Sequence, residues 1–213
     1  MTGGTAPPAQ RFTTVLFDLG RVLLDWDPRY YYGQFFPDDA AGLERFVTQG
    51  VGSEFILAMD AGCPAATVIP ERCQRFPEYA GLIARWPEGW PHMLRGPIAG
   101  TVDILRELKD RGTRLYALTN FSTETWPVAR ARFDFLHWFE DTIVSGEHRL
   151  VKPDPRIYAL AIRRCRIAPA STVFIDDAPV NVAAGNTAGL TALLFETPEK
   201  LRMDLQYRGL LPA

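Results

Sequence analysis

The sequence predicts an α/β protein built on a parallel, doubly wound sheet, with a small all-helical segment inserted after the first strand. Three observations support this prediction. An apolar, β-rich run at residues 12–18 ends in a single acid, Asp18, as a buried parallel strand would. Strand-like and helix-like segments alternate from about residue 96 onward. Between them, residues 27–95 are rich in aromatic residues, Pro and Gly and contain no convincing strand.

The segments after residue 96 alternate as a doubly wound sheet requires. Strands are predicted at residues 114–119, 141–145, 172–175 and 191–195, and helices at 98–110, 123–132, 155–165, 178–188 and 198–207. Further helices are expected near residues 38–49, 53–59 and 67–86, and residues 21–26 are predicted to form a hairpin flap beside the tip of the first strand. We therefore expect an α/β core of residues 1–26 and 96–213 and a helical cap of residues 27–95.

The composition narrows the class of protein. Of 213 residues, 47% are hydrophobic and 23% are charged, as in ordinary globular domains. A net charge of −2 provides no basic excess for nucleic acid, and no apolar run reaches the roughly 20 residues that cross a bilayer. Residues 1–10 lack a signal-peptide core and are expected to form a loose leader, and three widely spaced cysteines suggest reduced thiols. We expect a cytoplasmic protein that contacts neither nucleic acid nor membrane.

Polar and charged residues gather where the predicted strands end. Because the carboxyl ends of parallel strands meet at one edge of the sheet, these side chains are expected to lie close together. A carboxylate, a hydroxyl, an amine and an acidic pair suit phosphoryl transfer, since they supply a nucleophile, donors for phosphoryl oxygens and ligands for a hard cation. The set consists of Asp18, Thr119, Asn120, Lys152, Asp176 and Asp177.

Four segments of the chain resemble the four motifs of the haloacid dehalogenase-like (HAD) hydrolases. They are residues 17–23, 118–120, 151–158 and 174–182, and each falls at a predicted strand end or in the adjoining loop. The resemblance covers residues 12–26 and 96–196, whereas residues 27–95 match a family cap only in position and helical character. It implies a Rossmann-like core, a hydrolase that forms a covalent aspartyl intermediate, and Mg²⁺ as cofactor.

The resemblance also implies a role for each matching residue. Asp18 would be the nucleophile, Thr119 and Asn120 would contact the phosphoryl oxygens, and Lys152 would neutralise phosphoryl charge and keep Asp18 ionised. The metal ligands would be Asp18, Asp176, Asp177 and the backbone carbonyl of Gly20, with Asn181 orienting this group. The ordinary alternative is that the acids cap turns and helices and that Asn120 forms a turn.

The sequence departs from the family pattern at Gly20. Phosphatases of the family usually carry a second Asp there, which protonates the leaving group and later activates water. Glycine keeps the carbonyl that would bind metal but removes the acid. Asp25, Asp27 and His92 are the candidates considered as substitutes, although a solvated turn or a packed or exposed structural histidine explains them better. The aromatic residues 30–36 fit the core of the cap better than the lining of a pocket.

Three functions remain open at this stage. The first is a Mg²⁺-dependent phosphomonoester hydrolase acting on a small phosphorylated metabolite, with sugar phosphates among the candidates. The second is a 2-haloacid dehalogenase in which Asp18 attacks carbon; the acidic pair Asp176 and Asp177 argues against it. The third is a catalytically impaired module that binds a phosphometabolite or a protein. The sequence fits either a monomer or a homodimer.

Overall fold

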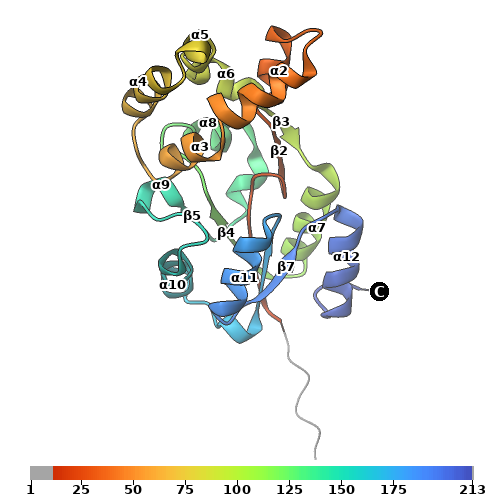
Figure 1. The fold of residues 1–213 in the computed structure, drawn as a ribbon. Helices are drawn as coiled ribbons and strands as arrows, with labels where there is room; N and C mark the ends of the chain where they lie inside the picture. Colours follow the sequence, from red (N-terminus) through yellow and green to blue (C-terminus); the bar gives the residue numbers. More distant parts are fainter. Residues whose placement is uncertain (1–11, 213) are drawn as a thin grey trace, which may run out of the picture.

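The computed structural model describes residues 12–212, so the leader predicted at residues 1–10 lies outside the described residues. Its centre is a five-stranded parallel sheet with the strand order β5-β4-β1-β6-β7 (Figure 1). The strands are β1 (Thr14–Phe17), β4 (Arg114–Thr119), β5 (Asp141–Val144), β6 (Thr172–Asp176) and β7 (Thr191–Leu194). The predicted doubly wound α/β fold is therefore confirmed, with the first strand at the centre of the sheet.

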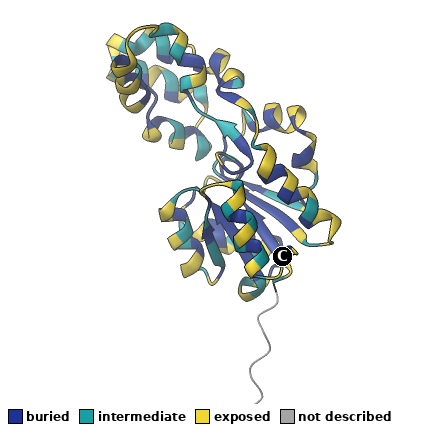
Figure 2. Cartoon of the chain, turned by 90° about the vertical axis from the view of Figure 1, so that its right-hand side faces the viewer, coloured by how far each residue is buried: buried dark blue, intermediate teal, exposed yellow. Residues whose placement is uncertain are grey.

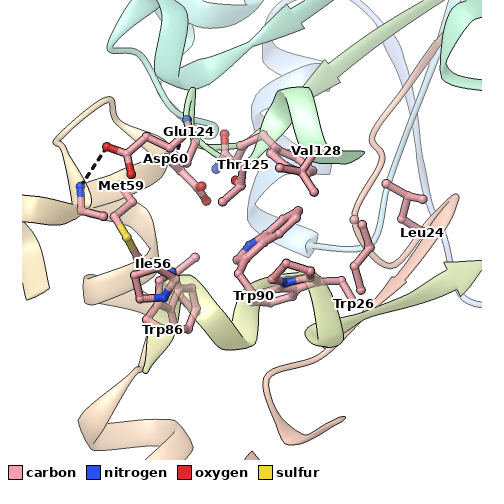
Figure 3. A pocket seen from close by; sticks show the side chains of 18 residues that line it. Leu24, Trp26, Ile56, Met59, Asp60, Trp86, Trp90, Glu124, Thr125 and Val128 are labelled. Carbon is pink, nitrogen blue, oxygen red and sulfur yellow. Dashed lines mark hydrogen bonds between the residues drawn. The ribbon is translucent and has the colours of Figure 1, made fainter. Parts of the chain in front are cut away.

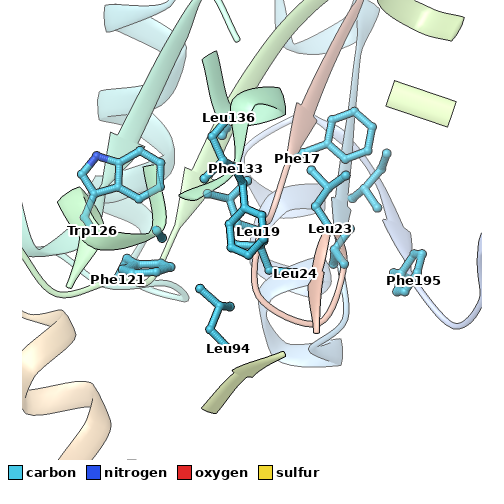
Figure 4. Packing of buried hydrophobic residues seen from close by; sticks show 14 of the residues in the cluster. Phe17, Leu19, Leu23, Leu24, Leu94, Phe121, Trp126, Phe133, Leu136 and Phe195 are labelled. Atoms are coloured by element: carbon cyan, nitrogen blue, oxygen red, sulfur yellow. The ribbon is translucent and has the colours of Figure 1, made fainter. Parts of the chain in front are cut away.

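Helices cover both faces of this sheet, which explains why every residue of β1 is buried. Successive side chains of a strand point to opposite faces. Val15 and Phe17 join a core cluster that includes residues of α7 (Ala99–Asp110) and α12 (Pro198–Tyr207). Leu16 joins a second cluster with residues of α10 (Pro155–Arg164), and α11 (Pro179–Thr187) packs on the same side. Figure 4 shows part of the first cluster, including Phe17.

The loops that follow β4 and β5 contain short helices. The helix predicted at residues 123–132 begins later, as α8 (Trp126–Arg132), and is followed by the 3₁₀ turn η4 (Asp134–His137). The strand predicted at 141–145 ends at Val144, because a single helical turn, α9 (Ser145–His148), starts at the next residue. A second 3₁₀ turn, η5 (Pro169–Ser171), precedes β6. These turns place Asn120 and Ser145 at the same edge of the sheet as Asp18.

The prediction of a hairpin flap at residues 21–26 is wrong. Strand β2 (Leu24–Trp26) pairs antiparallel with β3 (Leu94–Pro97), a strand far along the chain. Residues 20–23 form a turn, in which the backbone N–H groups of Leu23 and Leu24 donate to the carbonyl of Leu19. The Arg-Gly-Pro composition of β3 conceals it in the sequence, because Gly and Pro are depleted in strands. This two-stranded ribbon connects the sheet to the helices between residues 29 and 93.

Residues 29–93, called the helical insertion below, lie over the carboxyl edge of the sheet (Figures 1 and 2) and contain no strand in this described segment. The long helix predicted at 67–86 is divided, since Pro77 starts a separate turn. No described helix is long and apolar enough to span a membrane. The elements are α1 (Arg29–Tyr32), η1 (Gly33–Phe35), α2 (Ala40–Arg45), the π-helical turn η2 (Phe46–Gly50), α3 (Ser53–Asp60), α4 (Ala65–Arg75), η3 (Pro77–Tyr79), α5 (Ala80–Ile83) and α6 (Trp86–Met93).

Aromatic side chains form the core of the helical insertion. Tyr31 and Tyr32 are buried, and the ring of Tyr32 meets Phe46 edge-on with centroids 4.6 Å apart. Phe46 in turn contacts Tyr79 at 5.3 Å. Edge-to-face pairs of this kind stabilise a core beyond the area that they bury. The buried rings of Tyr31 and Tyr32 therefore pack within the insertion, and none of the aromatic residues 30–36 is among the described residues that line the cavity introduced below.

Candidate active site

The sheet edge brings Asp18, Lys152 and Asp176 into direct contact. Asp18 follows β1, and its Oδ1 accepts a hydrogen bond of 2.7 Å from the backbone N–H of Leu19. The Nζ atom of Lys152 lies 2.8 Å from Asp18 Oδ1 and 2.6 Å from Asp176 Oδ2. All three side chains are buried. A single ammonium group thus bridges two carboxylates that come from neighbouring strands.

Burial and the neighbouring charges shift the pKa values of Asp18 and Lys152 in opposite directions. Burial raises the pKa of Asp18 to about 7, although the charge of Lys152 acts in the other direction. Burial by itself would lower the pKa of Lys152, but the two carboxylates hold it above the ordinary value. Lys152 therefore stays protonated and is the main group that favours the ionised form of Asp18.

Asp177 completes a group of three carboxylates. Asp18, Asp176 and Asp177 each offer an oxygen, and these oxygens all lie within 4.8 Å of one another. Burial and the charge of Asp176 raise the pKa of Asp177. The Oδ1 atom of Asp176 accepts hydrogen bonds of 2.9 Å from Ala178 N and from Asn181 Nδ2, so its orientation is fixed. Mutually repelling, oriented carboxylate oxygens fit a hard divalent cation such as Mg²⁺.

Thr119 and Asn120 end β4 beside this group. Thr119 is buried. The side chain of Asn120 makes two hydrogen bonds with the backbone of Lys152: Nδ2 donates to the carbonyl at 3.1 Å, and Oδ1 accepts from the N–H at 2.8 Å. The structure thus uses both polar atoms of this amide to hold the loop that carries Lys152. Gly20 lies next to the same edge. A Cβ atom at this position would have no heavy atom within 4 Å.

A cavity of about 230 Å³ opens between this edge and the helical insertion (Figure 3). Gly20 and Asn120 line it on the side of the sheet, and α3, α6 and β3 contribute the opposite wall. Its lining is mainly apolar, and among the described residues that form it none is Lys, Arg or His. The large apolar side chains are Leu24, Trp26, Ile56, Met59, Trp86, Trp90, Leu94, Phe121 and Val128, and the acids are Asp60 and Glu124.

Asp60 is the residue of this region that sequence reasoning missed. It is the last residue of α3, and Figure 3 shows its carboxylate directed into the cavity. One signal was present, because an acid at the carboxyl end of a helix is unfavourable next to the helix dipole. An acid at this unfavourable position suggests a functional role. The sequence alone does not show that the end of this helix lies near Asp18.

The acids and the histidine considered as substitutes for the missing Asp lie elsewhere. Asp25 accepts a hydrogen bond of 2.7 Å from the Tyr30 hydroxyl, and Asp27 pairs with Arg29 at 3.1 Å. The ring of His92 stacks on Tyr31 with centroids 5.9 Å apart. None of the three lines the cavity. These side chains stabilise the insertion and its connection to β2.

Comparisons with known proteins agree with this architecture. Residues 92–189 match a family model described as haloacid dehalogenase-like hydrolase. The chain is 27% identical over 187 residues to the sesquiterpene phosphatase astK of Aspergillus oryzae, which covers 85% of this chain and 89% of that protein. It is 32% identical over 114 residues to flavin mononucleotide hydrolase 1 of Arabidopsis thaliana, covering 52% of this chain and 45% of that protein.

Solved structures share the fold at low sequence identity. A HAD-family enzyme of Bacteroides thetaiotaomicron, in complex with magnesium and inorganic phosphate, superposes with a TM-score of 0.64 at 21% identity, covering 87% of this chain and 95% of that one. The L-2-haloacid dehalogenase of Xanthobacter autotrophicus gives 0.65 at 15% identity, covering 94% and 85%. The fold alone therefore does not separate phosphatases from dehalogenases.

Fold, motifs and the family match point to the same class of protein. The central strand presents an acid to an edge that also holds a buried lysine and two further acids. The family match over residues 92–189 is to the haloacid dehalogenase-like hydrolases, and the fold agrees with that match. The chain is a hydrolase, and its curated relatives include proteins named as phosphatases.

Proposed function

We propose that this protein is a Mg²⁺-dependent phosphomonoester hydrolase that acts on a small phosphorylated metabolite through an aspartyl-phosphate on Asp18. The observation that carries the proposal is the contact of Lys152 with both Asp18 and Asp176, beside the carboxylate of Asp177. A dehalogenase that attacks carbon has no need for three acids at this edge. The phosphatase names of several relatives support the same choice.

Each residue of the site has its own role in the proposed reaction. The Asp18 carboxylate attacks phosphorus, the Lys152 ammonium binds a phosphoryl oxygen and stabilises the charge of the transition state, and the Thr119 hydroxyl donates to another oxygen. Asn120 positions Lys152 through its two hydrogen bonds. Asp18, Asp176, Asp177 and the Gly20 carbonyl would hold Mg²⁺, which when bound supplies positive charge for the phosphoryl oxygens. We further propose that the helical insertion is the cap of this active site.

Removal of divalent cations provides the first test. Phosphate release from phenyl phosphate is expected to fall by at least about a hundredfold after chelation and to return when Mg²⁺ is added. The parallel measurement is halide release from 2-chloropropionate without added metal. Halide release would support the dehalogenase alternative and overturn the proposal. Absence of turnover across a phosphate panel, with a phosphometabolite still binding, would indicate a catalytically impaired module.

The cavity indicates what kind of alcohol the phosphate esterifies. Its wall is formed by indole rings and aliphatic side chains, and its two charged residues are acids. Glu124 would repel an anionic organic group and no described lining residue is a cation that would attract one, whereas burial of an apolar group yields about 25 cal/mol per Å². At that rate roughly 55 Å² of apolar surface changes affinity tenfold. We therefore propose an uncharged, largely apolar organic group, in preference to a sugar.

A comparison of substrates, combined with one substitution, tests this preference. Wild-type kcat/KM is expected to be at least roughly tenfold higher for naphthyl or prenyl phosphate than for glucose 1-phosphate or 3-phosphoglycerate. Val128 lines the cavity and is 43% exposed, so Val128→Lys should fold normally while adding a positive charge. The substitution should raise KM for naphthyl phosphate and lower it for 3-phosphoglycerate, each by roughly tenfold, or about 1.4 kcal/mol.

Met203→Lys is the matched control, because Met203 is exposed on α12 and does not line the cavity. Its kinetic constants should equal those of the wild type for both substrates. A wild-type preference for glucose 1-phosphate, unchanged by Val128→Lys, would contradict the assignment of this cavity to the organic group.

A further inference from the structure

The space beside Asp18 at position 20 is open. A Cβ atom built on Gly20 would meet no heavy atom within 4 Å, so no other side chain of the described protein has packed into the place of the missing acid. Gly20 instead lines the cavity that extends toward the helical insertion. A leaving group bound in this cavity is therefore reached from the side of the insertion.

Asp60 is the acid that approaches from that side. It lines the same cavity as Gly20 and Asn120, its side chain is half-buried, and its carboxylate is directed into the cavity (Figure 3). Glu124 is the other carboxylic acid among the described lining residues, but its Oε1 accepts a hydrogen bond of 3.2 Å from the backbone of Ala65. The remaining lining residues include no other group that exchanges protons near neutral pH.

Specific contacts fix the end of α3 against the sheet edge. The Ser145 hydroxyl donates a hydrogen bond of 2.6 Å to the carbonyl of Asp60 and accepts one of 2.9 Å from the N–H of Phe121. Gly62 has a φ of +86°, and a Cβ there would lie 2.7 Å from the carbonyl oxygen of Gly146. Only glycine satisfies both the positive φ and this close approach. The position of Asp60 relative to Asp18 is thus built into the fold.

The surroundings of Asp60 favour its protonated form. Its pKa is raised to about 7, chiefly by burial and also by the charge of Asp18, while the charge of Lys152 acts in the other direction. These two groups face it from the sheet edge, Glu124 faces it from the cavity wall, and Arg149 lies beside Gly62. An acid with a pKa near neutrality can both donate and accept a proton, as general acid–base catalysis requires.

We propose that Asp60, from the helical insertion, is the general acid and base of the reaction and replaces the acid that Gly20 lacks. This inference rests on the proposed phosphomonoester hydrolysis. As the bond between phosphorus and the ester oxygen breaks and the Asp18 oxygen bonds to phosphorus, protonated Asp60 gives its proton to the ester oxygen, and the alcohol leaves. Ionised Asp60 then takes a proton from water, whose oxygen bonds to phosphorus. The bond between Asp18 and phosphorus breaks, its electron pair returns to the carboxylate, and hydrogen phosphate leaves with Asp60 protonated again.

The Asp60→Asn variant tests the proposal with two kinds of leaving group. With an alkyl phosphate, which needs a proton on its poor leaving group, kcat is expected to fall by at least about a hundredfold. With 4-nitrophenyl phosphate, the first step needs no acid. A burst of roughly one 4-nitrophenolate per active site should then precede slow turnover, because hydrolysis of the aspartyl-phosphate lacks its base. The falling limb of the wild-type pH profile, which reflects loss of the Asp60 proton at a pKa of about 7, should be absent in the variant, whereas ionisation of Asp18 affects the rising limb of both.

Stability provides a readout independent of activity. A carboxyl whose pKa is raised in the folded state destabilises the protein as pH rises from its unfolded pKa toward its folded pKa, because the unfolded chain ionises first. Asparagine carries no charge at any pH. Asp60→Asn should therefore raise Tm relative to the wild type at about pH 8 and have little effect at about pH 4. The matched control Asp38→Asn, at an exposed position of the insertion, should change neither Tm nor kinetics.

The outcomes separate this inference from the proposed function. Absence of wild-type phosphate release would contradict the proposed function itself. If the wild type is active, Asp60→Asn activity within about threefold of it on both substrates would overturn the role of Asp60. A higher KM with unchanged kcat and no burst would also overturn it, by assigning Asp60 to substrate binding. Loss of turnover in Glu124→Gln, with Asp60→Asn unaffected, would assign the proton transfer to Glu124 instead.

Discussion

Asp18→Asn is expected to abolish phosphate release, with kcat falling by at least about a thousandfold. The amide is nearly the same size as the carboxylate but is a far weaker nucleophile, so the aspartyl-phosphate cannot form. The proposed reaction has no second route, because both of its steps pass through this oxygen. The measurement is single-turnover kinetics with acid quenching, in which the wild type should yield protein-bound phosphate and the variant should yield none.

The fold of the Asp18→Asn variant is expected to remain intact. Burial disfavours the charged form of Asp18, so an uncharged amide at this position should not lower Tm. Lys152 also keeps its contact of 2.6 Å with Asp176. Asp134→Asn, at an exposed position in η4, serves as the control and should retain full activity. Turnover in the Asp18→Asn variant at more than about a tenth of the wild-type rate would place the nucleophile elsewhere.

The residues at the strand ends could be predicted because topology follows from local patterns. Buried strands are recognised from short apolar runs, and parallel strands present their carboxyl ends to one edge. Asp18, Lys152 and Asp176 lie far apart in the sequence, and the structure brings all three into direct contact. Prediction of the fold class required only the alternation of strand-like and helix-like segments after residue 96.

The features that were missed depend on tertiary contacts with weak local signals. Strand β3 contains Gly and Pro and is a strand only because β2 supplies its partner. The place of Asp60 depends on how α3 docks, which is decided by the contact of Gly62 with Gly146 and by the Ser145 hydrogen bond. A packing contact of this kind leaves no periodic pattern. Substrate-facing residues of an insertion are therefore harder to predict than those of the sheet.

Lys152→Met is expected to reduce both activity and stability. The substitution removes the ammonium that lies 2.8 Å from Asp18 and 2.6 Å from Asp176, and it leaves both buried carboxylates without this positively charged partner. Breaking a buried ion pair in this way destabilises a protein by about 3–5 kcal/mol. The phosphoryl group also loses its positive contact, so kcat/KM should fall by at least about a hundredfold. Lys200→Met is the control, because Lys200 is 41% exposed and pairs with Asp204 on the surface; its effect should stay within about 0.5 kcal/mol.

The pH dependence of this loss identifies its cause. Without Lys152, the folded pKa of Asp18 rises further above that of the unfolded chain, since the charge that favours ionisation is gone. Stability then falls as pH rises through the interval between the unfolded and folded pKa values. The free energy of unfolding, measured by urea titration, should therefore drop more at about pH 8 than at about pH 5, and Mg²⁺ should recover part of it by neutralising the carboxylates. An equal loss at both pH values would show that the methionine disturbs packing and that charge compensation by Lys152 contributes little.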